Sequence, residues 1–181
     1  MWGRRQEWHL GGAGSGSGGA YTSGHMRSIR DVGASMSLPD PDRLASAVSR
    51  VTSTMAGIRF CPAAPAASLP RCWRGALLPI PGRRPLTIAL FADRASCAAL
   101  TAAMLSCAVN EVDMAMIDDA LCELVNMTAG QIKNELAPSQ ALGLPRALDA
   151  APVFAASGDW AHVALHAGEL LLVVSLAERV Y

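Results

Sequence analysis

The amino-acid sequence predicts an α+β domain in which an antiparallel sheet is packed with long helices. Two observations support this prediction. The expected elements run helix, two strands, two helices, two strands, and each pair of strands is joined by a short turn. With 181 residues, of which 51% are hydrophobic, the chain can bury one sizeable core. We therefore expect a single folded domain and not a doubly wound parallel sheet.

The first 37 residues differ in composition from the rest of the chain. Residues 11–19 are only glycine, alanine and serine, which cannot bury enough apolar surface to become ordered. We expect residues 1–37 to be a disordered Gly/Ser-rich segment and residues 38–181 to be the folded domain. Two origins for the segment stay open: a tag or linker, or a mis-called start with Met26 or Met36 as the true first residue.

The first predicted helix begins after Asp40, a suitable N-cap, with Pro41 at its first position. Gly57 ends it. Its inward face is formed by apolar residues at helical spacing, namely Leu44, Val48, Val51 and Met55. After a loop over 61–70, strands are expected at Cys72–Ile80 and Leu86–Phe91. The Pro- and Gly-containing turn between them predicts a hairpin.

Asp93 is the expected N-cap of a second helix, Arg94–Cys107, in which Leu100, Met104 and Cys107 face inward. A long third helix covers about Asp113–Leu136, and Pro138 stops it. A loop over 138–158 follows. The chain closes with two strands, Ala161–His166 and Glu169–Leu176, joined at Ala167-Gly168.

The long helix has two distinct faces. Its apolar stripe recurs at three- and four-residue steps and consists of Ile117, Leu121, Leu124, Thr128, Ile132 and Leu136. Asp119, Glu123, Asn126 and Gly130 follow the same steps on the other side. Inside a helix, asparagine costs roughly 0.5 kcal/mol relative to alanine and glycine about 1 kcal/mol. The face is therefore either simply solvated or a binding site, at which the glycine would let a partner approach the backbone.

The spacing Asp119-x-x-x-Glu123-x-x-Asn126 resembles the active-site signature of the CheC/CheX/FliY chemotaxis phosphatases. The sequence is most similar to the CheX-like branch. Residues 51–57 resemble the end of its first helix, residues 123–130 its core block, and residues 142–145 (Leu-Gly-Leu-Pro) its following leucine-proline element. The resemblance runs through most of residues 40–180 in the right order.

The resemblance implies a phosphatase that hydrolyses the phosphoaspartate of a CheY-like receiver domain. Asn126 would position the attacking water, and Glu123 would pair with the receiver's active-site lysine. Asp119 would supply docking charge or orient Glu123, and Gly130 would lie at the contact with the partner. Mg²⁺ would come from the receiver, and no cofactor would be bound by this chain.

The family also implies a homodimer in which the sheet continues across the subunits. The last strand, Glu169–Leu176, is apolar enough to be such a covered edge. The alternative function is a non-catalytic CheX-like interaction module that binds a receiver or signalling partner without turnover. The Glu123/Asn126 pair argues against this alternative, because an adaptor has no need of the amide.

Other candidate sites have weaker support. His162 and His166 share one face of a strand, but no carboxylate or thiol accompanies them at metal-binding spacing. Ser96 and Cys97 have no base placed nearby, and Asp118 and Asp119 diverge around the helix. The five cysteines, which lack C-x-x-C spacing, are expected to be small buried residues in a reducing compartment.

Charge and hydropathy exclude several classes of partner. The formal net charge of zero gives no support for nucleic-acid or anionic-membrane binding. No apolar run reaches the roughly 20 residues of a membrane span. We expect a cytoplasmic protein.

Overall fold

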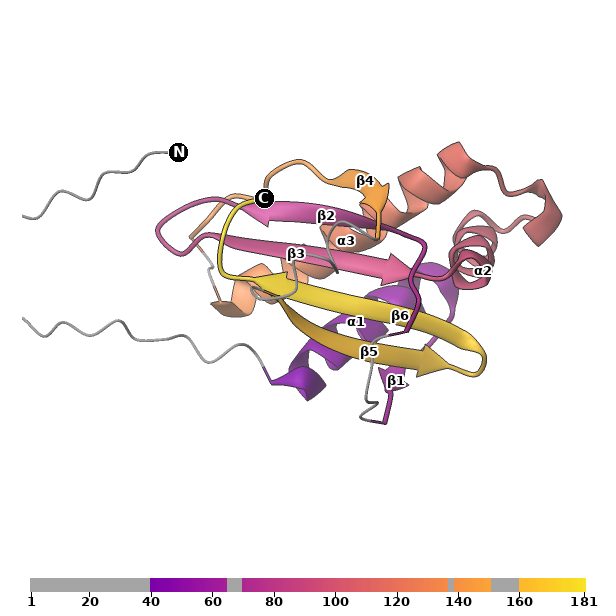
Figure 1. Ribbon diagram of the computed structural model, residues 1–181, viewed down its shortest axis with the longest axis horizontal. Helices are drawn as coiled ribbons and strands as arrows, with labels where there is room; N and C mark the ends of the chain where they lie inside the picture. The colour runs from indigo at the N-terminus through magenta and orange to yellow at the C-terminus, as the bar shows by residue number, and fades with distance from the viewer. Residues whose placement is uncertain (1–39, 65–69, 137–138, 151–159) are drawn as a thin grey trace, which may run out of the picture. The chain divides into compact units, whose positions relative to one another are not determined.

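The computed structural model describes residues 40–64, 70–136, 139–150 and 160–181, which form one α+β domain (Figure 1). Its elements, in chain order, are α1 (Pro41–Ala56), β1 (Cys61–Pro62), β2 (Arg74–Ile80), β3 (Leu86–Ala92), α2 (Arg94–Leu105), the 3₁₀ turn η1 (Val109–Glu111), α3 (Met114–Leu136), β4 (Arg146–Asp149), β5 (Ala161–Ala167) and β6 (Leu170–Ala177). The predicted fold class is confirmed. The boundary predicted between residues 37 and 38 lies outside the described residues.

The sheet has six strands in the order β1-β5-β6-β3-β2-β4, and every neighbouring pair is antiparallel. The hairpin of β2 and β3 runs from the pair Ile80–Leu86 at its turn to the pair Arg74–Ala92. The expectation that the last strand forms a sheet edge is wrong, because β6 pairs with both β5 and β3. Its apolar run reflects a central position in which residues on both faces are buried.

Two short edge strands were absent from the sequence-based expectations. β4 lies inside the segment predicted as a loop over 138–158, and β1 lies at the start of the loop predicted over 61–70. β1 has two residues and β4 has four, so neither is long enough to show an alternating pattern. The remaining predictions for residues 137–138 and 151–159, including the helix stop at Pro138, lie outside the described residues.

Side-chain caps fix where the helices begin. Asp40 Oδ1 accepts from the Asp42 amide at 3.2 Å, and Asp93 Oδ1 accepts from the Ser96 amide at 2.8 Å. At the C-terminus of α1, Gly57 adopts a left-handed conformation with φ of 67°. α2 ends at Leu105, earlier than predicted, because Ser106 takes the left-handed conformation (φ 53°).

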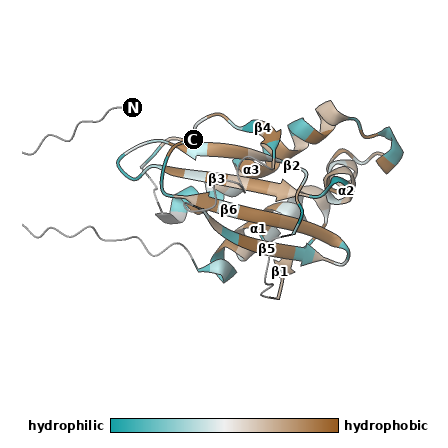
Figure 2. Ribbon diagram, viewed as in Figure 1, coloured by the Kyte–Doolittle hydropathy of each residue, from teal (hydrophilic) through white to brown (hydrophobic). Residues whose placement is uncertain are grey.

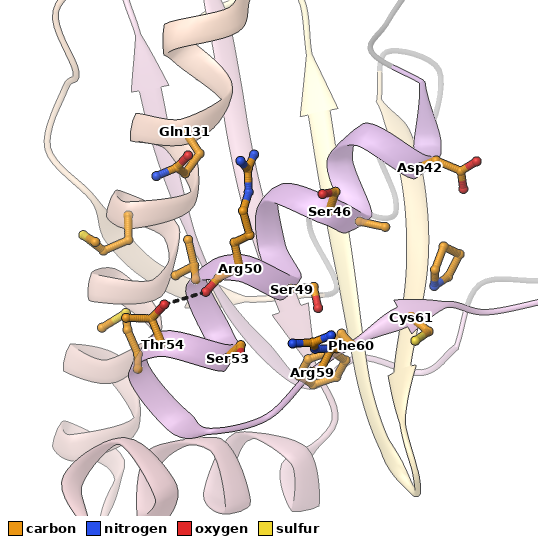
Figure 3. Close-up of a pocket in the computed structure, with 15 residues that line it drawn as sticks. Asp42, Ser46, Ser49, Arg50, Ser53, Thr54, Arg59, Phe60, Cys61 and Gln131 are labelled. Carbon is orange, nitrogen blue, oxygen red and sulfur yellow. Dashed lines mark hydrogen bonds between the residues drawn. The ribbon is translucent and has the colours of Figure 1, made fainter.

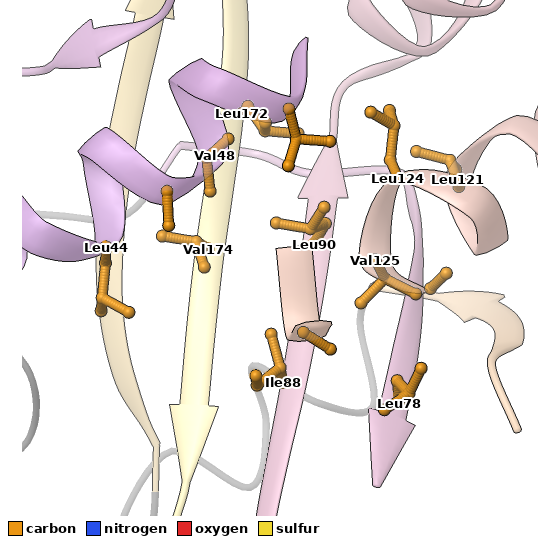
Figure 4. Packing of buried hydrophobic residues seen from close by; sticks show 14 of the residues in the cluster. Leu44, Val48, Leu78, Ile88, Leu90, Leu121, Leu124, Val125, Leu172 and Val174 are labelled. Carbon is orange, nitrogen blue, oxygen red and sulfur yellow. The ribbon is translucent and has the colours of Figure 1, made fainter. Parts of the chain in front are cut away.

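The core lies between one face of the sheet and the helices (Figure 4). Val48 from α1 and Leu124 and Val125 from α3 are fully buried against strand residues such as Leu90 and Val174. The predicted stripe of α3 is buried from Ile117 to Ile132, and the side chain of Leu136 lies outside the described set. Figure 2 shows the central strands as the most hydrophobic part of the sheet.

A smaller apolar cluster lies on the other face of the sheet. Phe91 and Val173 are fully buried there, and Trp160 stacks on Tyr181 with ring centroids 4.7 Å apart. Trp160 is thus a core residue. Within the described ranges, no helix combines the length and apolar composition that a bilayer span needs.

We predict that His162, on this second face, makes folding stability depend on pH. Its Nδ1 lies 2.7 Å from Ser175 Oγ, and burial lowers its pKa below the ordinary value of 6.5. The unfolded chain therefore binds the proton at a higher pH than the folded chain. The free energy of unfolding should fall as pH drops through about 6.5 toward the folded-state pKa.

Urea unfolding at several pH values between about 7 and 5 checks this prediction. His162→Gln should flatten the dependence, whereas His166→Gln, at an exposed position on the same strand, should leave it unchanged. An unaltered slope in His162→Gln would contradict the assignment.

Candidate functional site

The predicted functional face of α3 points away from the core. Asp119 and Glu123 are exposed, and Asn126 and Gly130 are half-buried, while the stripe on the opposite side is buried. Asp119, Glu123 and Asn126 follow one another at steps of four and three residues, so they occupy successive positions on one face. Within the described residues, none of their side chains forms a hydrogen bond or ion pair. A carboxylate and a carboxamide are therefore both open to an incoming molecule.

An ion-pair network that the sequence analysis missed holds α3 in this orientation. Arg74 on β2 forms a bidentate pair with Asp118, with Nη2 2.6 Å from Oδ2, and its Nη1 lies 2.9 Å from Asp149 Oδ1 on β4. The hydrogen bond to Asp118 is the main cause that raises the pKa of Arg74. Because Asp118 turns toward the sheet, Asp119 is left outside, as their divergence predicted. No local pattern could reveal partners 44 and 75 positions apart.

We predict that Arg74→Ala lowers the free energy of unfolding by about 1–2 kcal/mol. The side chains of Arg74 and Asp118 are only 18% and 28% exposed, so removing the guanidinium leaves a shielded carboxylate without its partner. Urea unfolding measures the change. Arg146→Ala, at an exposed position on the adjacent strand β4, is the matched control and should stay within about 0.5 kcal/mol of the parent protein. Equal effects of the two substitutions would contradict the stabilising role given to the ion pairs of Arg74.

Beside this face is an apolar hollow of about 420 Å³ between the ends of α1, α2 and α3, which we call the methionine hollow. Its apolar lining comes from Met55, Met104, Leu105, Met116 and Ala120. Asp119 and Glu123 also line it, so the hollow and the predicted site share two residues. Helical spacing predicts that Met55 and Met104 face inward, and no local sequence pattern reveals this surface.

A larger and more polar pocket, of about 860 Å³, runs along α1 (Figure 3). Figure 3 shows Ser46, Ser49 and Ser53 along the helix and Arg59 beside Phe60 just before β1. On the α3 side it is bounded by Met127 and Gln131. Neither Glu123 nor Asn126 lines it, so it is separate from the predicted site.

Gly130 is not required by internal packing. Among the described residues, no heavy atom outside its own helix and its chain neighbours would lie within 4 Å of a Cβ built on it. The structure therefore contains no steric reason for glycine at this helical position, where alanine would be more favourable. Open space over the backbone is what a close-approaching partner would need.

The serine and cysteine at the start of α2 are structural. Ser96 Oγ donates to Asp93 Oδ2 at 3.1 Å and accepts from the Leu171 amide at 2.8 Å, which ties α2 to β6. Burial raises the pKa of the Cys97 thiol to about 12. A protonated, buried thiol is not a nucleophile, so the expectation that Cys97 is a packing residue is confirmed.

Among the described residues, the other cysteines and histidines form no reactive centre. All five cysteines are free. Only Cys97 is fully buried, three are partly buried, and Cys61 is exposed in the edge strand β1, which corrects the expectation that the cysteines are buried. His162 and His166 both lie on β5, as predicted. In the part of the chain that the structure describes, no group of three or more His, Cys, Asp or Glu side chains could hold a metal ion.

Comparison with known proteins agrees with this fold. A family model described as chemotaxis phosphatase CheX matches residues 75–160, a span that includes all of α3. A search of curated proteins finds no match. The family match and the shared fold support a CheX-like protein, so the resemblance seen in the sequence is confirmed.

Solved structures of chemotaxis proteins share the fold. CheX from Vibrio vulnificus is 16% identical, with a TM-score of 0.61 over 75% of this chain and 93% of that one. CheX from Desulfovibrio desulfuricans is 18% identical, with a TM-score of 0.59 over 75% and 95%. The complex of CheX and CheY with BeF₃ and Mg²⁺ from Borrelia burgdorferi gives 15% identity and a TM-score of 0.63 over 76% and 96%.

Proposed function

We propose that this chain is a phosphatase that hydrolyses the phosphoaspartate of a CheY-like receiver domain, in the cytoplasm, in chemotaxis or two-component signalling. One observation carries the proposal. Glu123 and Asn126 lie on the outward face of α3, without a partner among the described residues, inside the span that matches the CheX family model.

The reaction needs little from the phosphatase beyond positioning. A water oxygen attacks phosphorus in line with the aspartyl oxygen, the bond between phosphorus and that oxygen breaks, and the products are inorganic phosphate and a free aspartate carboxylate. Mg²⁺ held by the receiver offsets the charge of the phosphoryl group. The carboxamide of Asn126 offers a donor and an acceptor on one plane, which suits it to orient the attacking water.

The neighbouring residues would fix the approach of the receiver. Glu123 would pair with the receiver's active-site lysine, and Asp119, one turn before it, would add docking charge. Gly130 leaves the backbone of α3 open, so that the two surfaces can come close. That the Borrelia burgdorferi structure is a complex of CheX and CheY supports a receiver as the partner.

We also propose that the chain forms a homodimer by continuing its sheet. Since β6 is central, such a contact would use an outer strand, β1 or β4. Sedimentation of the purified protein would test this, and a monomer at all concentrations would contradict it.

The test of the phosphatase proposal is the loss of phosphate from a phosphorylated receiver domain of the same organism, with and without this protein. Acceleration above the receiver's own rate, proportional to the amount of protein added, is expected. Binding should be measured on the same samples. Binding without acceleration would contradict catalysis and establish the interaction module instead, and neither binding nor acceleration would overturn both.

A further inference from the structure

The methionine hollow shares Asp119 and Glu123 with the proposed site, but its apolar lining has no part in the reaction described above. We propose that it is a second contact for the receiver domain, which seats one apolar side chain of the receiver that stands beside a lysine or arginine. This inference rests on the proposed function, because it takes the receiver as the partner.

The surface of the hollow favours an apolar occupant. Leu105 is 50% exposed and stands at its rim, although leucine is normally buried. Met55, Met104 and Met116 are each only partly buried around it. Unbranched methionine side chains can adjust their shape around a guest, and covering them removes apolar surface from water.

The charges around the hollow select the flanking residue of the partner. Asp119 and Glu123 are both exposed and both acidic, and no basic residue among those that the structure describes lines the hollow. A lysine or arginine beside the inserted side chain would therefore be attracted, and an acidic residue would be repelled. A hydrophobic side chain with a cationic neighbour is the chemistry that fits both features.

The position of the hollow makes the receiver its occupant. Glu123 belongs both to the hollow and to the proposed catalytic face, and Asp119 lies one turn before it. A receiver that pairs with Glu123 must lie over α3 and thus directly beside the hollow. The larger pocket along α1 does not share a charged residue with the catalytic face, so it lacks this continuity.

The decisive variant is Leu105→Lys, which puts a positive charge at the rim and removes an apolar wall. It should remain folded, because the side chain is half exposed and a cation at a helix C-terminus is favourable. The matched control is Met114→Lys, since Met114 is 45% exposed at the nearby start of α3 but does not line the hollow. Leu105→Met tests whether any apolar side chain suffices.

The measurement is the Kd for a CheY-like receiver of the same organism, loaded with BeF₃⁻ and Mg²⁺, together with the hydrolysis rate at saturating protein. Leu105→Lys should raise Kd about tenfold or more, since a buried apolar contact and its charge complementarity are both lost. Leu105→Met and Met114→Lys should stay within about twofold. The maximal rate should be the same for all four proteins, because Leu105 takes no part in the chemistry.

The possible outcomes distinguish a failure of the hollow as a contact from a failure of the phosphatase proposal. An unchanged Kd for Leu105→Lys, or an equal loss in Met114→Lys, would overturn the hollow as a contact and leave the phosphatase proposal standing. If the parent protein binds the receiver but does not accelerate hydrolysis, and only Leu105→Lys loses binding, the result would support the hollow as a contact and overturn catalysis. A parent protein that does not bind the receiver at all would overturn both. Unfolding in urea confirms that each variant is folded.

Discussion

Asn126→Ala is expected to abolish the acceleration of receiver dephosphorylation while leaving the protein as stable as before or slightly more so. Asn126 is half-buried on α3 and makes no hydrogen bond within the described residues. Its removal therefore leaves none of those residues without a hydrogen-bond partner. Alanine is the better helix former by about 0.5 kcal/mol. What disappears is the group proposed to orient water, and loss of a positioning group costs on the order of 10²-fold or more in rate.

The matched control for this experiment is Asn134→Ala. Asn134 is an exposed asparagine two turns further along α3 and lies outside the predicted site, so the helix gains the same propensity without any change in chemistry. Phosphate release and unfolding should be measured on both variants, with receiver binding followed in parallel. If Asn126→Ala retained the parent rate, or if Asn134→Ala lost it equally, the role given to Asn126 would be wrong.

Gly75→Ala is expected to lower the free energy of unfolding by about 3 kcal/mol or more. Gly75 lies on β2 opposite Phe91 of β3, and a Cβ placed there would stand 2.2 Å from the Leu90 carbonyl oxygen and 2.3 Å from Phe91 Cδ1. The carbonyl is fixed in the sheet and the ring is fully buried, so neither can move aside cheaply. Urea unfolding measures the loss, and expression in soluble form should fall with it.

Gly130→Ala provides the opposite case with the same chemical change. In the part of the chain that the structure describes, no atom outside the helix opposes a Cβ at Gly130, so the substitution should stabilise α3 by about 1 kcal/mol. A Gly75→Ala protein as stable as the parent would show that the β2–β3 contact is looser than described. A destabilised Gly130→Ala protein would show that a side chain at this position meets an obstacle that the structure does not contain.

Local sequence signals account for most of the fold. Asp40, Asp93 and Gly57 mark helix ends through their own side chains or backbone freedom, and the stripe of α3 follows from its spacing. Which strands pair is not a local property. The apolar run of β6 is equally consistent with a covered edge and with a central strand, and only the structure identifies its neighbours as β5 and β3.

For the candidate site, too, local features could be predicted from the sequence and long-range contacts could not. The face that carries Glu123 and Asn126 could be predicted, because helical periodicity decides which residues share a side. The contacts around it could not. Arg74 is far from Asp118 in the sequence, and Met55, Met104 and Met116 come from three different helices. Their roles depend on the packing of α1 and α2 against α3, about which hydropathy spacing contains no information.

The anchoring of α3 has a consequence for the thermodynamics of recognition. The helix spans 23 residues, its inner stripe is buried from Ile117 to Ile132, and Asp118 is held by Arg74. Glu123 and Asn126 therefore project from a preorganised scaffold and not from a loop that must first become ordered. Little backbone entropy is lost when a partner docks, so more of the free energy of contact remains as affinity. The backbone of α3 should therefore change little on association.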